Sequence, residues 1–294
     1  MTDTLAAPLP PTVARAASPA SLDVSIKQEA RKATLRAVGS SLLTFGLTIV
    51  AVVVLWVGAL WVFNVSPYVG KGPVDVWNYL FALPASGANR AQMFSQLWVT
   101  LGHSAVGFFA GLVVALLVAM IFQLSRGAEH ALMPLAMLLR SVPLVAMAPV
   151  IILIFGRDFA SVAVIGGIVV LFPALVNIVF GLKSAPPQMN DLVSVYGGSS
   201  WTTLRKVALP SALPSLLAAV RISVPGAITG ALLAEWLAVG GGIGGAVGGY
   251  IAAAQFSALW TAVVFVTATA LILYNLVQLL EAVVLARMGM SDRA

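Results

Sequence analysis

Long apolar runs, separated by shorter polar segments, dominate the sequence. A helix needs about 20 apolar residues to cross roughly 30 Å of hydrocarbon, and each run approaches or exceeds that length. The runs lie at residues 42–63, 97–123, 135–155, 160–182, 219–238 and 257–280. They predict an all-α, polytopic membrane bundle of about six transmembrane helices, with both chain ends on the same side of the membrane.

The composition supports a membrane location. Hydrophobic residues make up 60% of the chain and charged residues only 9%, whereas a soluble protein carries about 25% charged residues. The absence of cysteine excludes disulfides and thiolate ligands, and His103 and His130 stand in unrelated contexts. We therefore expect no catalytic, cofactor or metal site. The basic residues are not interleaved with aromatic residues in a stripe, so no nucleic-acid partner is expected.

Lys and Arg outside the apolar runs predict the orientation. With a cytoplasmic N-terminus, twelve of them fall in inside segments and three in outside segments, while Arg140 remains inside an expected span. Since positive charge accumulates on the cytoplasmic side, both termini are expected there. The inside residues are Arg15, Lys27, Arg31, Lys32, Arg36, Arg126, Lys183, Arg205, Lys206, Arg221, Arg287 and Arg293, and the outside residues are Lys71, Arg90 and Arg157.

The remaining organisation follows from composition. Residues 1–37, rich in Ala, Pro, Ser and Thr, predict a disordered cytoplasmic tail that ends in a short basic helix. Residues 38–96 hold the first transmembrane helix and an extracytoplasmic connection long enough for a short interfacial helix. Residues 97–287 form the main transmembrane domain, and residues 288–294 a cytoplasmic tail.

One polar segment, DLVSVYGGSSWTTLRKVALPSALP at residues 191–214, interrupts the apolar runs. We expect Asp191 to start a helix, Gly197 and Gly198 to break it, Ser199 or Ser200 to cap a second helix, and Pro210 and Pro214 to end that helix. Its expected apolar face consists of Val195, Tyr196, Trp201, Leu204 and Val207. A cytoplasmic helix-turn-helix of this kind is suited to lie on lipid or to fill a groove in another protein.

This segment resembles the cytoplasmic EAA loop of permease subunits of ATP-binding cassette (ABC) importers. The family pattern is Glu-Ala-Ala, three residues, Gly, and a later Leu-Pro. Asp191-Leu192-Val193 occupies the triplet, Gly197 the glycine, and Leu209-Pro210 the close. The triplet keeps only its acidic character.

Further segments extend the resemblance over roughly residues 95–285. VTLGHSAVGFFAG (99–111) is similar to the first core helix of the family. LLRSVPLVAMAPVIILIFG (138–156) and LAEWLAVGGGIGG (233–245) are similar to the nitrate, sulfonate and taurine branch. The implied fold is the transmembrane domain of a type I ABC importer, which is called MetI-like.

The resemblance also implies a function. The chain would be a permease subunit in the bacterial cytoplasmic membrane, forming the pathway for a small solute such as nitrate, a sulfonate, taurine or a pyrimidine-type compound. Its implied partners are a dimer of ATPase subunits, an extracytoplasmic solute-binding protein and a second permease copy. ATP is expected on the ATPase, because the sequence contains no G-x-x-x-x-G-K-[ST] motif. Within the loop at 184–215, the residues implied in coupling are Asp191, Tyr196, Gly197, Trp201, Arg205, Leu209 and Pro210.

Two charged residues near the expected spans are candidates for the pathway. Arg140 either faces the pathway or extends its long side chain to the interface. We expect Glu235 to be a hydrated interfacial carboxylate, with contact to substrate or docking protein as the alternative. His103 is expected to pack at a helix crossing. Gly226 and Gly230 form a G-x-x-x-G motif that suits either a permease–permease interface or packing within the chain.

An ion-gradient-driven secondary transporter is the alternative function. Such transporters place carboxylates at mid-membrane and often contain inverted repeats. The expected spans contain no Asp or Glu near their centres, and no repeat is evident. Asn275, Gln278 and Glu281, at spacings of three residues on the last span, are explained by hydrogen bonds between helices. These features favour the ABC importer.

Overall fold

The computed structural model describes residues 46–289, in which every regular element is helical. The chain divides into two units between Val65 and Ser66. The described part of the first unit is the apolar helix Gly46–Val62, whose end is closed by the Val65 N–H donating to the Leu60 carbonyl at 3.0 Å. The expected disordered tail and its basic helix lie outside the described residues.

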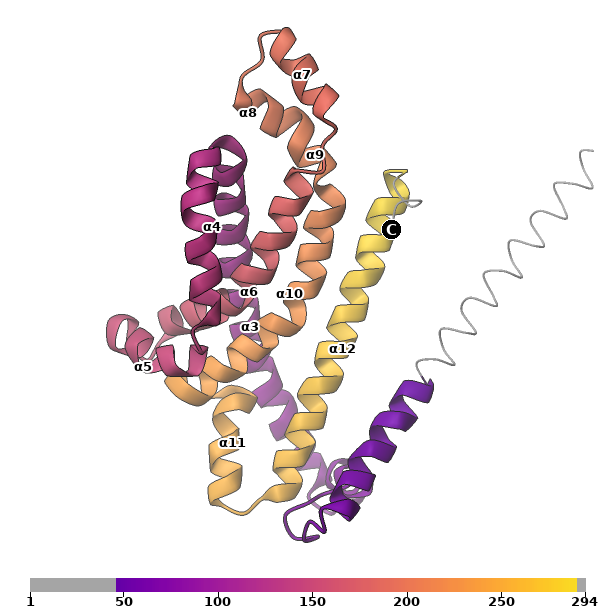
Figure 1. The fold of residues 1–294 in the computed structure, drawn as a ribbon. Helices are drawn as coiled ribbons and strands as arrows, with labels where there is room; N and C mark the ends of the chain where they lie inside the picture. The colour runs from indigo at the N-terminus through magenta and orange to yellow at the C-terminus, as the bar shows by residue number, and fades with distance from the viewer. Residues whose placement is uncertain (1–45, 290–294) are drawn as a thin grey trace, which may run out of the picture. The chain divides into compact units, whose positions relative to one another are not determined.

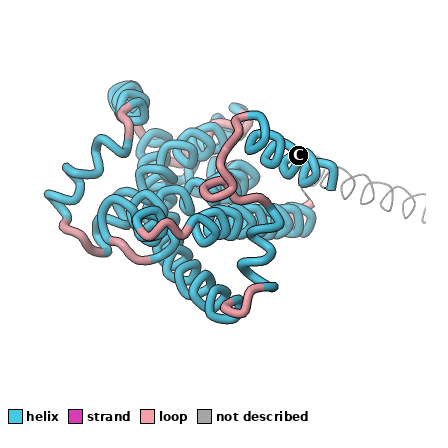
Figure 2. The backbone as a smooth tube through the Cα atoms, turned by 90° about the horizontal axis from the view of Figure 1, so that it is seen from below, coloured by secondary structure: helices cyan, strands magenta, loops and turns pink. Residues whose placement is uncertain are grey.

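The second unit is a bundle of long helices with short helical pieces at its two ends (Figure 1). Figure 2, viewed from below, shows helices throughout, joined by short loops. The elements are α2 (Pro73–Trp77), the π-helix η1 (Asn78–Ala82), α3 (Ser86–Leu124), α4 (Arg126–Ser141), α5 (Leu144–Phe155), α6 (Phe159–Leu182), α7 (Pro187–Val195), α8 (Ser200–Thr203), the π-helix η2 (Leu204–Ala208), α9 (Leu209–Ser211), α10 (Leu213–Ala234), the π-helix η3 (Glu235–Val239), α11 (Gly242–Ala252) and α12 (Phe256–Arg287).

Among the described residues, four helical stretches are long and apolar enough to cross a membrane. They are α3, α6, α10 continued by η3, and α12. They contain the runs expected at 97–123, 160–182, 219–238 and 257–280. The number rises to five if α4 and α5 form one span. Gly46–Val62 is a shorter apolar helix, and residues 42–45 of the expected run lie outside the described residues.

The apolar run expected to span at 135–155 is not one continuous helix. α4 and α5 are separate helices that meet at an angle of 104°. Between them, Val142 and Pro143 are extended, with ψ angles of 124° and 117°. The ring of Pro143 disfavours a helical conformation at Val142, and its nitrogen cannot donate a helical hydrogen bond. Pro149 lies inside α5 without ending it, so the break belongs to Pro143.

The centre of the bundle depends on glycine. A Cβ added to Gly107 of α3 would lie 2.7 Å from the Cα of Gly166 on α6, and one added to Gly230 of α10 would lie 2.8 Å from the same atom. Real Cβ atoms do not approach this closely, so the three helices are in backbone contact. A Cβ added to Gly226 would also face α6, 3.6 Å from the Cγ1 atom of Val169. The G-x-x-x-G motif therefore packs within the chain, as small residues do between membrane helices.

The connection before α3 contains the expected short helix, which consists of α2 followed by η1. It is held against the start of α12. The Trp260 indole N–H donates to the Val69 carbonyl at 2.9 Å, and the rings of Tyr68 and Phe256 meet edge to face at 5.4 Å. α12 lies at the periphery of the bundle, because only 17% of its most apolar 18-residue stretch is buried, compared with 50% for the corresponding stretch of α6.

Candidate functional site

Residues 187–212 form a helical hairpin at one end of the second unit, with α7 and α8 at its tip (Figure 1). The first arm starts at Pro187, whose fixed φ suits the first position of a helix. Asp191 is therefore not at the start of α7 but in its middle, and its side chain is exposed. The prediction that Asp191 starts the helix is wrong, because the proline four residues earlier already does so.

A glycine turn closes the hairpin. Gly197 has a φ of +73°, which residues with a Cβ adopt only at a cost. The Gly198 N–H then donates to the Val193 carbonyl at 2.8 Å, ending α7. The second arm begins at Ser199, whose hydroxyl accepts from the Thr202 N–H at 3.4 Å. The expected glycine break and serine cap are both confirmed.

The second arm is longer than expected. α8, η2 and α9 follow one another, and Pro210 lies within α9 instead of ending it. Pro214 lies in the first turn of α10, where a proline is tolerated because its missing N–H would have no partner there. The prediction that both prolines end the helix is wrong, and the arm leads almost directly into a membrane span.

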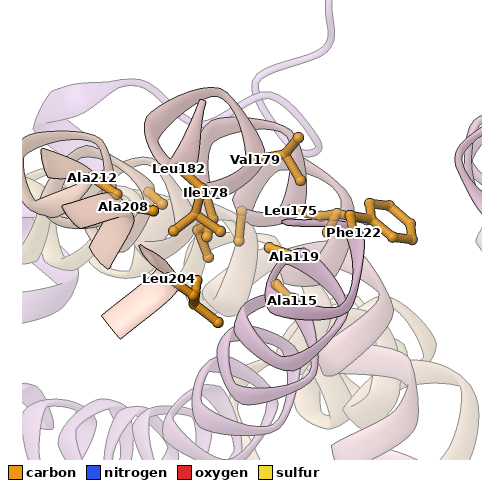
Figure 3. Close-up of a cluster of buried hydrophobic side chains, with 12 residues drawn as sticks. Ala115, Ala119, Phe122, Leu175, Ile178, Val179, Leu182, Leu204, Ala208 and Ala212 are labelled. Atoms are coloured by element: carbon orange, nitrogen blue, oxygen red, sulfur yellow. The ribbon is translucent and has the colours of Figure 1, made fainter. Parts of the chain in front are cut away.

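The second arm is anchored in a hydrophobic cluster that it shares with α3 and α6. Leu204, Ala208 and Ala212 are fully buried with residues of α3 and α6 (Figure 3). The α3 and α6 residues labelled there are Ala115, Ala119, Phe122, Leu175, Ile178, Val179 and Leu182. Val207 is buried as well. The expectation that Leu204 and Val207 belong to the exposed face is wrong, since both pack into the chain's own core.

The tip of the hairpin stays exposed. Val195 and Tyr196 are 82% and 83% exposed, and Trp201 is 56% exposed. Of the other expected coupling residues, Arg205 and Pro210 are exposed, and Leu209 is half-buried at the base. The hairpin thus combines an apolar, aromatic tip with a rigidly packed root, which suits insertion into a groove of another protein.

Arg140 is exposed on the last turn of α4, directly before the bend. A cation there interacts favourably with the negative end of the helix dipole. Its guanidinium forms no ion pair with any residue in the described part of the chain. A pathway role for Arg140 stays a prediction.

Glu235 is fully buried, so the expectation of a hydrated carboxylate is wrong. Its Oε2 accepts hydrogen bonds from the Thr100 hydroxyl at 2.9 Å and from the Gly244 N–H at 2.8 Å. Its Oε1 lies 2.8 Å from Nδ1 of His103. Both carboxylate oxygens therefore have partners, as a buried charge requires.

These contacts explain the glycine-rich sequence after Glu235. The Thr100 hydroxyl also accepts from the Ile243 N–H at 2.9 Å, so Glu235 and Thr100 together cap the N-terminus of α11. A Cβ at Gly242 would overlap with the Glu235 carboxylate, and one at Gly244 would lie 2.9 Å from the Cα of Leu232. The glycines allow α11 to fold back against its own carboxylate cap.

Thr100 is not among the residues predicted from the sequence, and no pattern in the sequence connects His103 with Glu235. The available signal for Thr100 and His103 was their spacing of three residues, which puts both polar side chains on one face of an apolar helix. No local pattern could join them to a carboxylate more than 130 residues away. Across residues 46–289, no three His, Asp or Glu side chains gather to hold a metal ion.

A second interhelical pair lies nearer the hairpin. Arg221 Nε of α10 is 3.2 Å from Glu281 Oε2 of α12, and the guanidinium lies 5.9 Å from the ring centre of Tyr274. The contact joins two helices, but neither atom forms a hydrogen bond with another described residue, so the interhelical hydrogen bond expected at Glu281 is not observed. The Asn275 side chain donates to the Leu271 carbonyl of its own helix at 2.7 Å. This hydrogen bond lies within α12 and does not support the interhelical bond expected at Asn275.

The chain matches one protein-family model, that of the binding-protein-dependent transport system inner membrane component, over residues 107–289. A probable ABC transporter permease protein of Haemophilus influenzae is 31% identical over 46% of this chain and 57% of its own length. The riboflavin transport system permease protein RibX of Chloroflexus aurantiacus is 33% identical over 30% and 32%. A putative aliphatic sulfonates transport permease protein, SsuC of Bacillus subtilis, is 29% identical over 57% and 59%. The chain thus covers less than two thirds of each relative.

Proposed function

Because the chain belongs to the family of binding-protein-dependent transport system inner membrane components, we propose that it forms the membrane pathway of an ABC importer. In this function it imports a small solute while a separate ATPase supplies the energy. The chain itself is a multi-pass membrane protein and a transport subunit, not an enzyme.

The observation that carries the proposal is the contrast within the hairpin. Tyr196 is 83% exposed at the tip, whereas Leu204, eight residues later on the second arm, is fully buried between α3 and α6. A partner that binds and moves this exposed aromatic tip would also move the buried second arm and the membrane helices packed against it. Packed helices respond to such a movement as rigid bodies, which is the physical basis of alternating access.

We infer the partners from the family, and the exposed tip of the hairpin supports one of them, the ATPase. The hairpin binds one subunit of an ATPase dimer through Asp191, Tyr196, Gly197, Trp201, Arg205, Leu209 and Pro210. ATP binds to that dimer. A second copy of this chain completes the pathway, and a solute-binding protein delivers solute at the opposite end, near α11. The excess of Lys and Arg in the segments on the hairpin side supports a cytoplasmic hairpin and cytoplasmic termini.

The solute is proposed from the relatives. Their names cite aliphatic sulfonates, nitrate, bicarbonate, riboflavin and formylaminopyrimidine. Three of these five, the sulfonates, nitrate and bicarbonate, are anions, and Arg140 would suit such a solute if it faces the pathway. We therefore propose a small polar organic or inorganic solute, with an anion as the first class to test.

Reconstitution of the chain with its ATPase and binding protein in proteoliposomes tests the function. Uptake is expected to require ATP and to be insensitive to ionophores that dissipate ion gradients. Gly197→Pro should abolish co-purification of the ATPase, because proline cannot adopt a φ of +73°. Deletion of residues 195–205 should do the same while membrane insertion is retained.

Gly289→Pro is the matched control. Gly289 has a φ of +68° and, like Gly197, no atom within 4 Å of the position of an added Cβ, but it lies at the end of α12. The control should insert and co-purify with the ATPase normally. Normal co-purification of Gly197→Pro, or uptake that follows an ion gradient without ATP, would contradict the proposal and favour a secondary transporter.

A further inference from the structure

A polar cavity of about 600 Å³ lies beside the base of the hairpin, where four helices end or begin. The last turns of α3 and α6 and the first turns of α4 and α7 form its walls. Its lining includes Gln123, Arg126, Glu129, His130, Lys183 and Asn190. The volume is within the range of small-ligand sites, which is about 300–1,000 Å³. None of the contacts proposed for the ATPase uses this cavity.

The lining favours an anion. Lys183 forms an ion pair with Glu129, so these two charges offset one another. Arg126 is exposed and forms no ion pair with any described residue, which leaves one positive charge in excess. The N-termini of α4 and α7 add the positive ends of two helix dipoles. His130 is held by its Nδ1–H donating to the Arg126 carbonyl at 2.6 Å.

One acceptor in the wall has no partner. The Oδ1 atom of Asn190 is buried and receives no hydrogen bond from any residue of the described chain. Leaving such an acceptor unpaired costs about 1–3 kcal/mol. An occupant that combines a phosphate with a hydroxyl or amino donor would satisfy Arg126 directly, and it would reach Asn190 Oδ1, which is closed off from solvent in this structure, only after a rotation of the Asn190 side chain.

The position of the cavity identifies the source of that occupant. α3 and α6 are membrane spans, and their apolar sequence ends at Leu124 and Leu182, at the cavity itself. Ile121 and Phe180, within one turn of it, are 49% and 72% exposed. The hydrocarbon-facing surface therefore reaches to the cavity, which lies at the depth of the phospholipid headgroups. Basic pockets between membrane helices at this depth recognise anionic headgroups.

We propose that this cavity binds the headgroup of a phosphatidylglycerol molecule. The phosphate lies against Arg126 and Lys183, and a glycerol hydroxyl donates to Asn190 Oδ1. The net positive lining favours this anionic lipid over zwitterionic phosphatidylethanolamine. Because Asn190 belongs to α7, the bound lipid would tie the first arm of the hairpin to α4. The proposal goes beyond the transport function and stands or falls separately from it.

Native mass spectrometry of the purified full-length chain, titrated with single lipids, tests the proposal. Phosphatidylglycerol should bind more tightly than phosphatidylcholine. Arg126→Gln should weaken phosphatidylglycerol binding about fivefold, since one basic residue near an anionic lipid contributes about that factor. Arg287→Gln, which removes an exposed charge from the end of α12, is the matched control and should bind like the parent chain.

Phosphatidylmethanol separates the two contacts, because it has the phosphate but no hydroxyl donor. The parent chain should prefer phosphatidylglycerol over phosphatidylmethanol, and Asn190→Leu should remove this preference while Arg126→Gln keeps it. Equal binding by Arg126→Gln and Arg287→Gln would overturn the proposal. Displacement of the lipid by equimolar glycerophosphoglycerol would also overturn it, by assigning the cavity to a soluble phosphate ester. Loss of ATPase association by Arg126→Gln with unchanged lipid binding would assign it to the ATPase.

Discussion

Nδ1 of His103 on α3 lies 2.8 Å from Oε1 of Glu235, the first residue of the π-helical turn after α10. The carboxylate is fully buried, and the imidazole is 23% exposed. The pair joins two membrane spans at the same point where Thr100 and Glu235 cap α11. The cluster therefore fixes the end of the bundle opposite the hairpin, and its residues can be tested by stability measurements.

Glu235→Ala should destabilise the protein severely. The change leaves the His103 ring, the Thr100 hydroxyl and the Gly244 N–H without their buried acceptor, and breaking such a buried pair costs about 3–5 kcal/mol. Thermal unfolding of the purified chain in detergent measures the effect. Asp191→Ala removes an exposed carboxylate from α7 and should leave stability within about 0.5 kcal/mol. Similar melting temperatures for both variants would show that the cluster contributes little.

Gly244→Ala should destabilise α11, whereas Gly248→Ala in the same helix should not. The added Cβ at Gly244 would overlap with the Leu232 carbonyl, while nothing lies within 4 Å of the Cβ position at Gly248. Alanine at Gly248 is expected to stabilise the helix by up to about 1 kcal/mol through its higher helix propensity. Melting temperatures of the two variants should therefore shift in opposite directions. A shift of the same sign and size in both would contradict the packing described.

Tyr196→Ala and Leu204→Ala should separate the two roles of the hairpin. Tyr196 is exposed, so its truncation should reduce ATPase co-purification while changing stability by less than about 0.5 kcal/mol. Leu204 is buried, so its truncation should cost about 2–5 kcal/mol of stability. Phe180→Ala, which removes an aromatic side chain that is 72% exposed on α6, is the control and should retain ATPase binding. Undiminished ATPase binding by Tyr196→Ala would exclude the tip as the contact.

Arg221 and Glu281 should show energetic coupling. A double-mutant cycle with Arg221→Gln and Glu281→Gln is expected to give an interaction energy of about 0.5–3 kcal/mol, the range for contacting residues. Thermal unfolding of the parent and three variants provides the four values. Lys206→Gln combined with Glu281→Gln forms the control cycle, because no ion pair joins these two residues. Additive effects in the Arg221–Glu281 cycle would mean that the pair does not hold α10 to α12.

Much of the helical hairpin could be predicted from the sequence. The glycine turn and the serine cap depend on residues next to one another in the chain, and both are where the sequence placed them. The ends of the arms were misplaced because a proline can start a helix as well as end one. Leu204 was assigned to the surface because an amphipathic pattern does not say whether its apolar face meets the same chain or another.

By itself, the sequence determined that the chain is a helical membrane protein, which segments are apolar enough to span, and that a glycine turn follows residue 196. These properties depend on the free energy of transferring each segment into lipid and on local backbone conformation, which nearby residues set. Only the tertiary structure decided that Glu235 is buried with Thr100 and His103, and that the 135–155 run bends by 104°. Partners far apart in sequence share no local signal, because only the packing of α3, α6 and α10 through their glycines brings them within hydrogen-bonding distance.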